Sequence, residues 1–322
     1  MSFTLVAKHE KDARANRDAY CQALREEMTV DPSIMHVDCD LMGCINTNKL
    51  QKEFPNNVFN AGIAEANAVG VAAGLASTGK KVFVHSFGCF AARRCFDQAF
   101  LSAGYSKLNV KIIGSDPGVT AEINGATHMP FEDCGLYLNV PNAVVIDSCD
   151  YVQTYALTKE LIHNCDQLSY MRLIRKGFKT IYGDGSTFEI GKGVVLKEGK
   201  DVTLIGSGIM VDKVLEAQEM LAAEGISAKV IDMHTWKPLD EELILASAAE
   251  TGCIVTAENH QVATGLGSAI ANVLAKNKPV PMEMIGVQNE YGQVGPQDFL
   301  CEAYYMTTKD IVEAAKKAMA RK

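Results

Sequence analysis

One carboxylate stands out by its surroundings. Glu65 lies in NVFNAGIAEANAVGVAAGLASTGKKVFVHSFGCF, residues 57–90, where most neighbours are small or apolar. An acid at the first position of a helix can simply favour the positive end of the helix dipole. The strand KVFVHSF that follows, however, ends on Phe87, with Phe90 three residues later. A carboxyl group beside an aromatic wall suits a flat heterocycle whose ring nitrogen needs a hydrogen bond. Both explanations are open.

The elements that must position these residues alternate between helix and strand. Helical periodicity over 13–29 precedes the strand IMHVDCD, and NVFNAG leads into the helix EANAVGVAAGLAST. A further helix near 94–104 and the strands NVKIIGS, NAVVIDS and LSYMRLI complete this half. The alternation predicts a mostly parallel sheet, and ligands bind at the carboxyl ends of such strands.

A Gly-rich stretch then separates a second set of elements. GFKTIYGDGSTFEIGKG is followed by DVTLIGS, AKVIDMH, CIVTAEN and PMEMIGV, four predicted strands with helical patterns between them. We therefore expect an α/β fold class with two domains, each a mostly parallel sheet flanked by helices. The predicted boundaries are 1–182 for the first domain, 183–193 for the linker and 194–322 for the second domain.

Composition excludes several classes of protein. The 322 residues are 48% hydrophobic and 22% charged, as in a globular chain that buries a core. A net charge of -8 with scattered Lys and Arg offers no footprint for nucleic acid. Apolar runs are too short to cross a bilayer and the N-terminus is too charged for a signal peptide, so we expect a cytoplasmic protein without membrane contact. The ten cysteines show no CxxC spacing, which favours buried reduced thiols.

Three further motifs give weaker evidence of a functional site. GSGIMV, which begins at Gly206, lacks the third glycine of a dinucleotide fingerprint, so a strand-to-helix turn is the better interpretation. The GDG of 183–185 has no asparagine pair some thirty residues later and is interpreted as a turn. Glu258, Asn259 and His260, at a strand end, could form a polar site or serve a turn or an interface.

The motifs taken together are more specific. They are ANRDAYCQAL, DCDLMG, GIAEANAVGVAAGLA, SFGCFAARRCFDQ, NGATHMPFED, MRLIR, HTWKPLD and VTAENHQVATGLGSA, spread over nearly the whole chain. With them the sequence resembles the transketolase family, specifically the pyrimidine-binding half of a split transketolase whose halves are separate polypeptides. Single motifs are shared with deoxyxylulose phosphate synthase and with the β subunits of 2-oxo acid dehydrogenases.

The resemblance implies roles for the residues around the cofactor. Glu65 would hydrogen-bond the aminopyrimidine nitrogen of thiamine diphosphate, favouring the imino form that removes the proton from the thiazolium carbon. Phe87 and Phe90 match the aromatic positions that pack on this ring, and a third aromatic position falls on Arg93. Asp40 matches an acid near the cofactor, although a strand-end acid capping a turn is an equal alternative.

Substrate positions depart from the family pattern more than cofactor positions do. His128, in GATH, matches a histidine that contacts substrate hydroxyls and helps proton transfer, whereas the acid that reads sugar stereochemistry becomes Asn124. The residues that hold a sugar phosphate follow the same trend: Arg17 and Arg175 are retained, but a serine becomes Cys44 and a histidine becomes Asp116. We expect an anionic sugar, either a pentose phosphate or a nonstandard donor such as a sulfo-sugar or apulose phosphate. An acid would repel a dianion there unless it is paired.

None of these motifs comes from the other half of a transketolase, which binds the diphosphate and Mg²⁺. The resemblance therefore implies a separate N-terminal transketolase subunit that holds the metal and diphosphate, an α2β2 heterotetramer, and activity only with that partner. A non-catalytic scaffold subunit is the alternative from another class.

Overall fold

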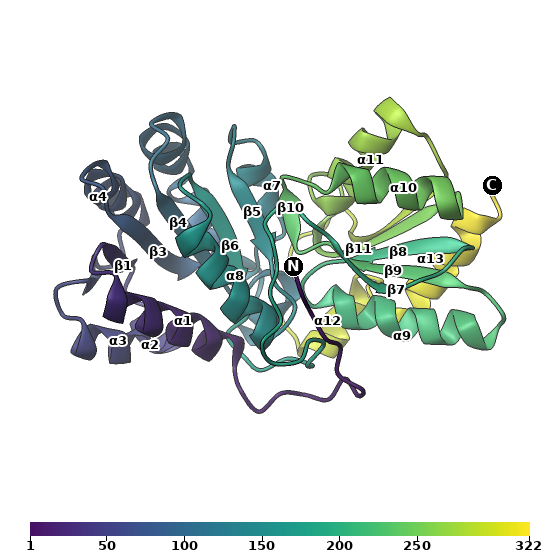
Figure 1. The fold of residues 1–322 in the computed structure, drawn as a ribbon, viewed down its shortest axis with the longest axis horizontal. Coiled ribbons are helices and arrows are strands. Elements are labelled where there is room, and N and C mark those ends of the chain that lie inside the picture. The colour runs from purple at the N-terminus through teal and green to yellow at the C-terminus, as the bar shows by residue number, and fades with distance from the viewer.

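Seven strands form the first sheet of the computed structural model, which describes all 322 residues (Figure 1). All of them run parallel except one edge strand. Most are buried along their length, as expected for a sheet covered by helices on both faces. In spatial order the strands are β10 (Thr235–Lys237), β5 (Val144–Asp147), β6 (Ser169–Leu173), β4 (Val110–Ser115), β3 (Lys81–Phe87), β1 (Ile34–Asp38) and β2 (Val58–Asn60).

Helices cover this sheet, and α1 and α8 lie side by side along one of its faces (Figure 1). The α-helices are α1 (Asn16–Val30), α2 (Met42–Ile45), α3 (Thr47–Glu53), α4 (Glu65–Ser77), α5 (Gly88–Arg93), α6 (Phe96–Gln98), α7 (Asp133–Leu138) and α8 (Tyr151–His163). Residues Ala99–Tyr105 form a π-helix, and Gly118–Asn124 and Ala126–His128 form 3₁₀ turns.

The helix expected near 94–104 is interrupted. It begins earlier, as α5, and ends at Arg93, because Cys95 leaves the helical region with φ −122° and ψ 16°. The chain resumes as α6 and the π-helix. Just before the break, the consecutive arginines Arg93 and Arg94 have different partners, which matters for the site described below.

The second sheet has five strands rather than the four expected. Their order is β12 (Met282–Val287), β11 (Ile254–Gln261), β8 (Val202–Gly206), β9 (Ala228–Asp232) and β7 (Val194–Lys197), with β7 antiparallel to β9. Its helices are α9 (Met210–Ala223), α10 (Glu241–Thr251), α11 (Leu266–Asn277), α12 (Gln297–Ala303) and α13 (Thr308–Met319). β7 escaped the sequence analysis because it is a four-residue edge strand directly after a Gly-rich stretch.

One strand pairing joins the two halves, and isolated bridges hold the segment between them. β10 leaves the second half to pair antiparallel with β5 of the first sheet, with Thr235 opposite Ile146. The N-terminal residues form isolated bridges with the segment before β7, such as Leu5 with Tyr182 and Ser2 with Thr187. The stretch expected to be a linker is thus tied down by backbone contacts, and the two halves, each with its own sheet, lie side by side (Figure 1).

All ten cysteines are free thiols, most of them buried, in agreement with the sequence-based expectation. None of the helices combines the length and the apolar character that spanning a bilayer requires.

Candidate active site

Glu65 is the first residue of α4, as expected, and is buried with 5% of its surface exposed. The hydroxyl of Ser86 donates a hydrogen bond to its Oε1 over 3.1 Å. The guanidinium of Arg94 donates to both carboxylate oxygens, over 3.3 and 3.4 Å. A role toward the helix dipole requires neither burial nor these partners. The carboxylate is therefore held in a defined place at the edge of the first sheet.

Three rings gather beside this carboxylate. Phe87 ends β3, Phe90 lies one turn into α5, and His128 ends the second 3₁₀ turn after β4. The Phe87 and Phe90 centroids lie 6.2 Å apart, and the His128 ring lies 5.6 Å from Phe87 and 5.2 Å from Phe90. The Cζ atom of Arg94 lies 3.8 Å from the centroid of Phe90, which links these rings to the carboxylate. The structure thus brings together the residues that the sequence had grouped as an acid beside an aromatic wall.

His128 and Asn124 lie on the irregular loop between β4 and α7. The Nδ1 atom of His128 lies 2.7 Å from the hydroxyl of Thr127, and its ring is partly exposed. Asn124 is exposed. Asn259 of β11 supports the start of this loop, because its amide accepts from Val119 N and donates to Pro117 O, both over 2.9 Å.

The other two residues of the strand-end motif have similar interface and turn roles. Glu258 accepts from the backbone N–H groups of Leu266 and Gly267 at the start of α11, and burial raises its pKa to about 8. His260 accepts from Gly135 N at the start of α7 over 3.2 Å. Its pKa falls to about 4, mainly through burial. These contacts support the interface interpretation of the motif.

Asp116 and Arg175 form a pair next to the rings. Arg175 Nε lies 3.1 Å from Asp116 Oδ1, and the Arg175 Cζ atom lies 5.9 Å from the centroid of Phe87. Asp116 is 2% exposed, adopts a left-handed backbone with φ 57°, and has no partner for Oδ2. Burial raises the pKa of the Asp116 carboxyl, and the nearby Arg175 guanidinium opposes that rise. Asp116, which the sequence analysis expected to repel an anion unless it had a partner, is therefore paired with Arg175.

Arg17 and Arg175 line one cleft of about 430 Å³ with two cations that the sequence analysis did not single out, Lys11 and Lys176. Arg17 donates to the backbone carbonyl of Cys44 over 2.8 Å, while its Nε is buried without a partner. No acid lines this cleft. It has the charge and the size to take an anionic group.

Two residues of the predicted cofactor wall have other partners. Asp40 is exposed and accepts from the side-chain amide of Asn60 over 2.9 Å, a contact between side chains that does not cap a turn. Arg93 pairs with Glu132 over 2.6 Å instead of facing Glu65, and the adjacent Arg94 takes that place.

Below this edge lies a buried polar network that the sequence analysis missed. His85 bonds through Nδ1 to Asp38 Oδ2 over 2.8 Å and through Nε2 to Ser115 Oγ over 3.0 Å. His36 lies 3.8 Å from the same carboxylate, and hydrogen bonds and charges from both histidines hold the Asp38 pKa well below its usual range despite burial. The network ties β1, β3 and β4 together one residue before Ser86 and Asp116. The sequence held one signal for this network, an acid and a histidine at positions that lie opposite each other on neighbouring strands.

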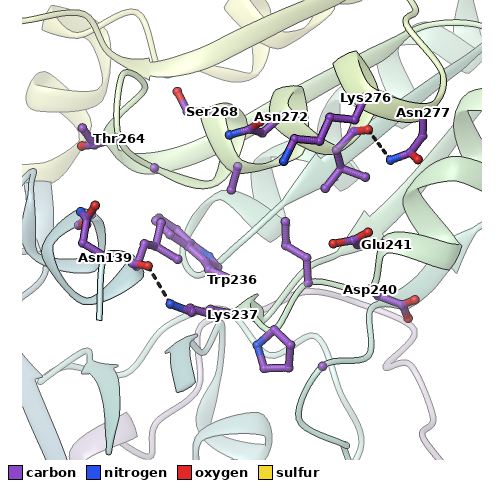
Figure 2. Close-up of a pocket in the computed structure, with 18 of the residues that line it drawn as sticks. Asn139, Trp236, Lys237, Asp240, Glu241, Thr264, Ser268, Asn272, Lys276 and Asn277 are labelled. Carbon is purple, nitrogen blue, oxygen red and sulfur yellow. Dashed lines mark hydrogen bonds between the residues drawn. The ribbon is translucent and has the colours of Figure 1, made fainter. Parts of the chain in front are cut away.

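A larger cleft lies elsewhere. About 940 Å³ in volume, it separates α11 from the segment around β10 (Figure 2). Ser268, Asn272 and Lys276 line one wall, and Asn139 and Lys237 lie opposite (Figure 2). The Lys237 ammonium donates to the carbonyl of Leu138, the last residue of α7, over 2.8 Å and to the carbonyl of Val140 over 2.6 Å. None of the site residues predicted from the sequence lines it.

Comparison with known proteins decides the family. Residues 12–179 match the profile "Transketolase, pyrimidine binding domain", and residues 191–311 match "Transketolase, C-terminal domain". The chain belongs to the transketolase family. It is a split transketolase subunit, which confirms the resemblance inferred from its motifs and the α/β fold class.

Relatives of similar length support this assignment. The chain is 45% identical to the 6-deoxy-6-sulfo-D-fructose transketolase subunit of Clostridium sp. (strain MSTE9) over 306 residues, 95% of each chain. It is 37% identical to one subunit of the apulose-4-phosphate transketolase of Phocaeicola vulgatus over 277 residues, 86% of this chain and 88% of that one. A solved structure described as a split gene transketolase, inactive β4 tetramer, matches with a TM-score of 0.88 and 42% identity, covering 97% of this chain and 100% of that one.

Proposed function

We propose that this chain is the pyrimidine-binding subunit of a two-chain transketolase that moves a glycolaldehyde unit from a ketose to an aldose. A separate subunit holds the diphosphate and Mg²⁺, and two copies of each chain form an α2β2 enzyme. The family supplies thiamine diphosphate as the cofactor. When bound, it provides an electron sink at its thiazolium carbon. Split relatives that match this chain over nearly their whole length support a requirement for both subunits.

One observation carries this proposal. Glu65, a buried carboxylate at a helix start, shares the Arg94 guanidinium with the ring of Phe90, which packs against Phe87 at the carboxyl edge of a parallel sheet. This donor set fits an aminopyrimidine, because the carboxyl can share a proton with a ring nitrogen while the rings pack on its faces. Glu65 thus orients the ring and holds the proton at that nitrogen.

His128 serves the substrate. Its ring lies within 6 Å of both phenylalanines and is partly exposed, so it can reach a hydroxyl of a sugar bound in front of the aromatic rings. Imidazole is suited to proton transfer near neutral pH. Asn124, on the same loop, offers one donor and one acceptor group to sugar hydroxyls.

The donor carries an anionic group at the end remote from the ketol. Arg17 and Arg175 bind it, and Lys11 and Lys176 add charge to the same cleft. Among donors, a sulfo-sugar such as 6-deoxy-6-sulfofructose has the best support. The relative named for that substrate is 45% identical to this chain over 95% of each chain. In addition, the Arg175 guanidinium is already paired with the Asp116 carboxylate. Apulose 4-phosphate and a standard pentose phosphate are the alternatives.

The test is reconstitution. The chain is co-purified with a diphosphate-binding partner, thiamine diphosphate and Mg²⁺, and sulfonated and phosphorylated ketoses are screened for glycolaldehyde transfer. Transfer that needs both subunits and is lost in Glu65→Gln supports the proposal. A complex that assembles but transfers nothing from any ketose would instead assign this chain a scaffold role.

A further inference from the structure

Arg94 contacts the two groups that the proposed function assigns to the pyrimidine ring of the cofactor, the Glu65 carboxylate and the Phe90 ring. Its guanidinium donates to the two oxygens of Glu65 and lies over Phe90, with its Cζ 3.8 Å from the ring centroid. A guanidinium is planar and carries N–H donors at its edge, so it shares these two features with an aminopyrimidine. The same carboxylate and the same ring cannot serve both partners at once.

The remaining contacts show that Arg94 can leave. Half of its side chain is exposed, and its side chain donates hydrogen bonds to Glu65 alone. It follows the last residue of α5, just before the helix breaks at Cys95, so a change of side-chain rotamer moves it into solvent without disturbing a helix. The adjacent Arg93 is fixed to Glu132 and does not compete for the site.

We propose that Arg94 is a placeholder for the cofactor's pyrimidine in the separate subunit, and that it must leave Glu65 and Phe90 when the ring enters. The inference rests on the proposed function, since it assigns the ring to those two residues. In the separate chain the guanidinium gives the buried carboxylate a partner, because an unpaired buried charge is costly. In the assembled enzyme the same contact lowers the apparent affinity for the cofactor, as any competing state does.

The test replaces Arg94 by Ala and, separately, by Lys, with Arg25→Gln as the matched control. Arg25 is an exposed arginine of α1 that pairs with Glu53 over 2.6 Å and contacts none of the site residues. Two quantities are measured: the thermal stability of the separate chain, and the thiamine diphosphate affinity of the assembled two-chain complex, by calorimetry. Circular dichroism checks that each variant is folded.

A placeholder predicts opposite changes in the two quantities. Arg94→Ala lowers the melting temperature of the separate chain and tightens cofactor binding to the complex about three- to tenfold, the range for one partly exposed ion pair and one cation–π contact. Arg94→Lys, which keeps the charge but loses the planar group, gives a smaller gain. Arg25→Gln leaves the cofactor affinity as in the wild type.

Other results overturn the inference in distinct ways. Weaker cofactor binding by Arg94→Ala would make Arg94 a ligand of the cofactor, and unchanged binding would make it a structural residue. In both cases the wild-type complex still binds, so the proposed function stands. If no complex binds thiamine diphosphate, wild type included, the proposed function fails and the placeholder fails with it.

Discussion

Asp116 offers a direct test of how the enzyme distinguishes its donors. Its carboxylate holds Arg175 Nε at 3.1 Å and is almost wholly buried, so it withholds one of the cations from an incoming anion and adds a negative charge beside it. The change to consider is Asp116→Asn, which keeps the size and removes the charge. Arg175 is then free to bind the donor's anionic end.

The expected size of the effect follows from the pair. A hydrogen bond to a charged group contributes about 1.5 to 3 kcal/mol. We take the lower end, because 26% of the Arg175 side chain is exposed and solvent screens the pair. About 1.4 kcal/mol is tenfold in affinity for a monoanion such as a sulfonate. Coulomb energy scales with charge, and a phosphate monoester carries about −1.5 to −2 at pH 7, so a phosphate gains roughly twice as much free energy.

The assay compares two ketoses that differ only in the anionic group, 6-deoxy-6-sulfofructose and fructose 6-phosphate. We expect kcat/KM to rise for both, and the phosphate-to-sulfonate ratio of kcat/KM to rise about tenfold, the difference between the two gains. Asp166→Asn, an exposed acid remote from the site, is the matched control. A ratio unchanged within about twofold, or one that moves toward the sulfonate, would mean that Asp116 does not read the charge of the donor.

Three further predictions concern Glu65, Arg175 and Asp232, a buried acid at the end of β9 that accepts hydrogen bonds from Gln153 and Tyr182. Glu65→Gln should slow exchange of the thiazolium proton, followed by NMR in the complex, by about 10² to 10⁴ without loss of fold, and an unchanged rate would remove its assigned role. Arg175→Ala should raise KM for any anionic donor, each lost charged hydrogen bond costing about 1.5 to 3 kcal/mol, with kcat much less affected; equal KM values for charged and uncharged ketoses would contradict this. Asp232, whose pKa burial raises to about 7, binds a proton more readily in the folded than in the unfolded chain, so it contributes stability below pH about 4 that is lost as pH rises toward 7. Urea unfolding of Asp232→Asn should therefore show a shallower fall in stability between about pH 4 and pH 7, by up to about 1.4 kcal/mol per pH unit, and an unchanged slope would show that Asp232 is ionised throughout.

The sequence predicted the parts of the site that local pattern controls. Glu65 at a helix start, Phe87 at a strand end and Phe90 one turn later depend on neighbouring residues only, and the structure has all three where the pattern placed them. The alternation of helices and strands likewise predicted a parallel sheet and therefore the edge at which the site lies.

The rest of the site and of the fold depended on features that the local sequence pattern does not encode. Predicting which of Arg93 and Arg94 contacts Glu65 required the exact course of α5, because consecutive side chains on a helix point about 100° apart. Lys11 reaches the anion cleft from a segment without helix or strand. β10 pairs with a strand some ninety residues earlier, and such long-range pairing leaves no local signal.

Cofactor binding by the separate chain and by the assembled complex is the most direct measurement of whether this subunit supplies half of a shared site. Calorimetry with thiamine diphosphate and Mg²⁺ should detect no binding to this chain alone and clear binding once the diphosphate-binding partner is added, because the chain offers a carboxylate and rings for the pyrimidine but matches only the pyrimidine-binding and C-terminal domains. Glu65→Gln in the mixture should still assemble while binding more weakly. Tight Mg²⁺-dependent binding by this chain alone would show that it holds the diphosphate itself and that no second subunit completes the site.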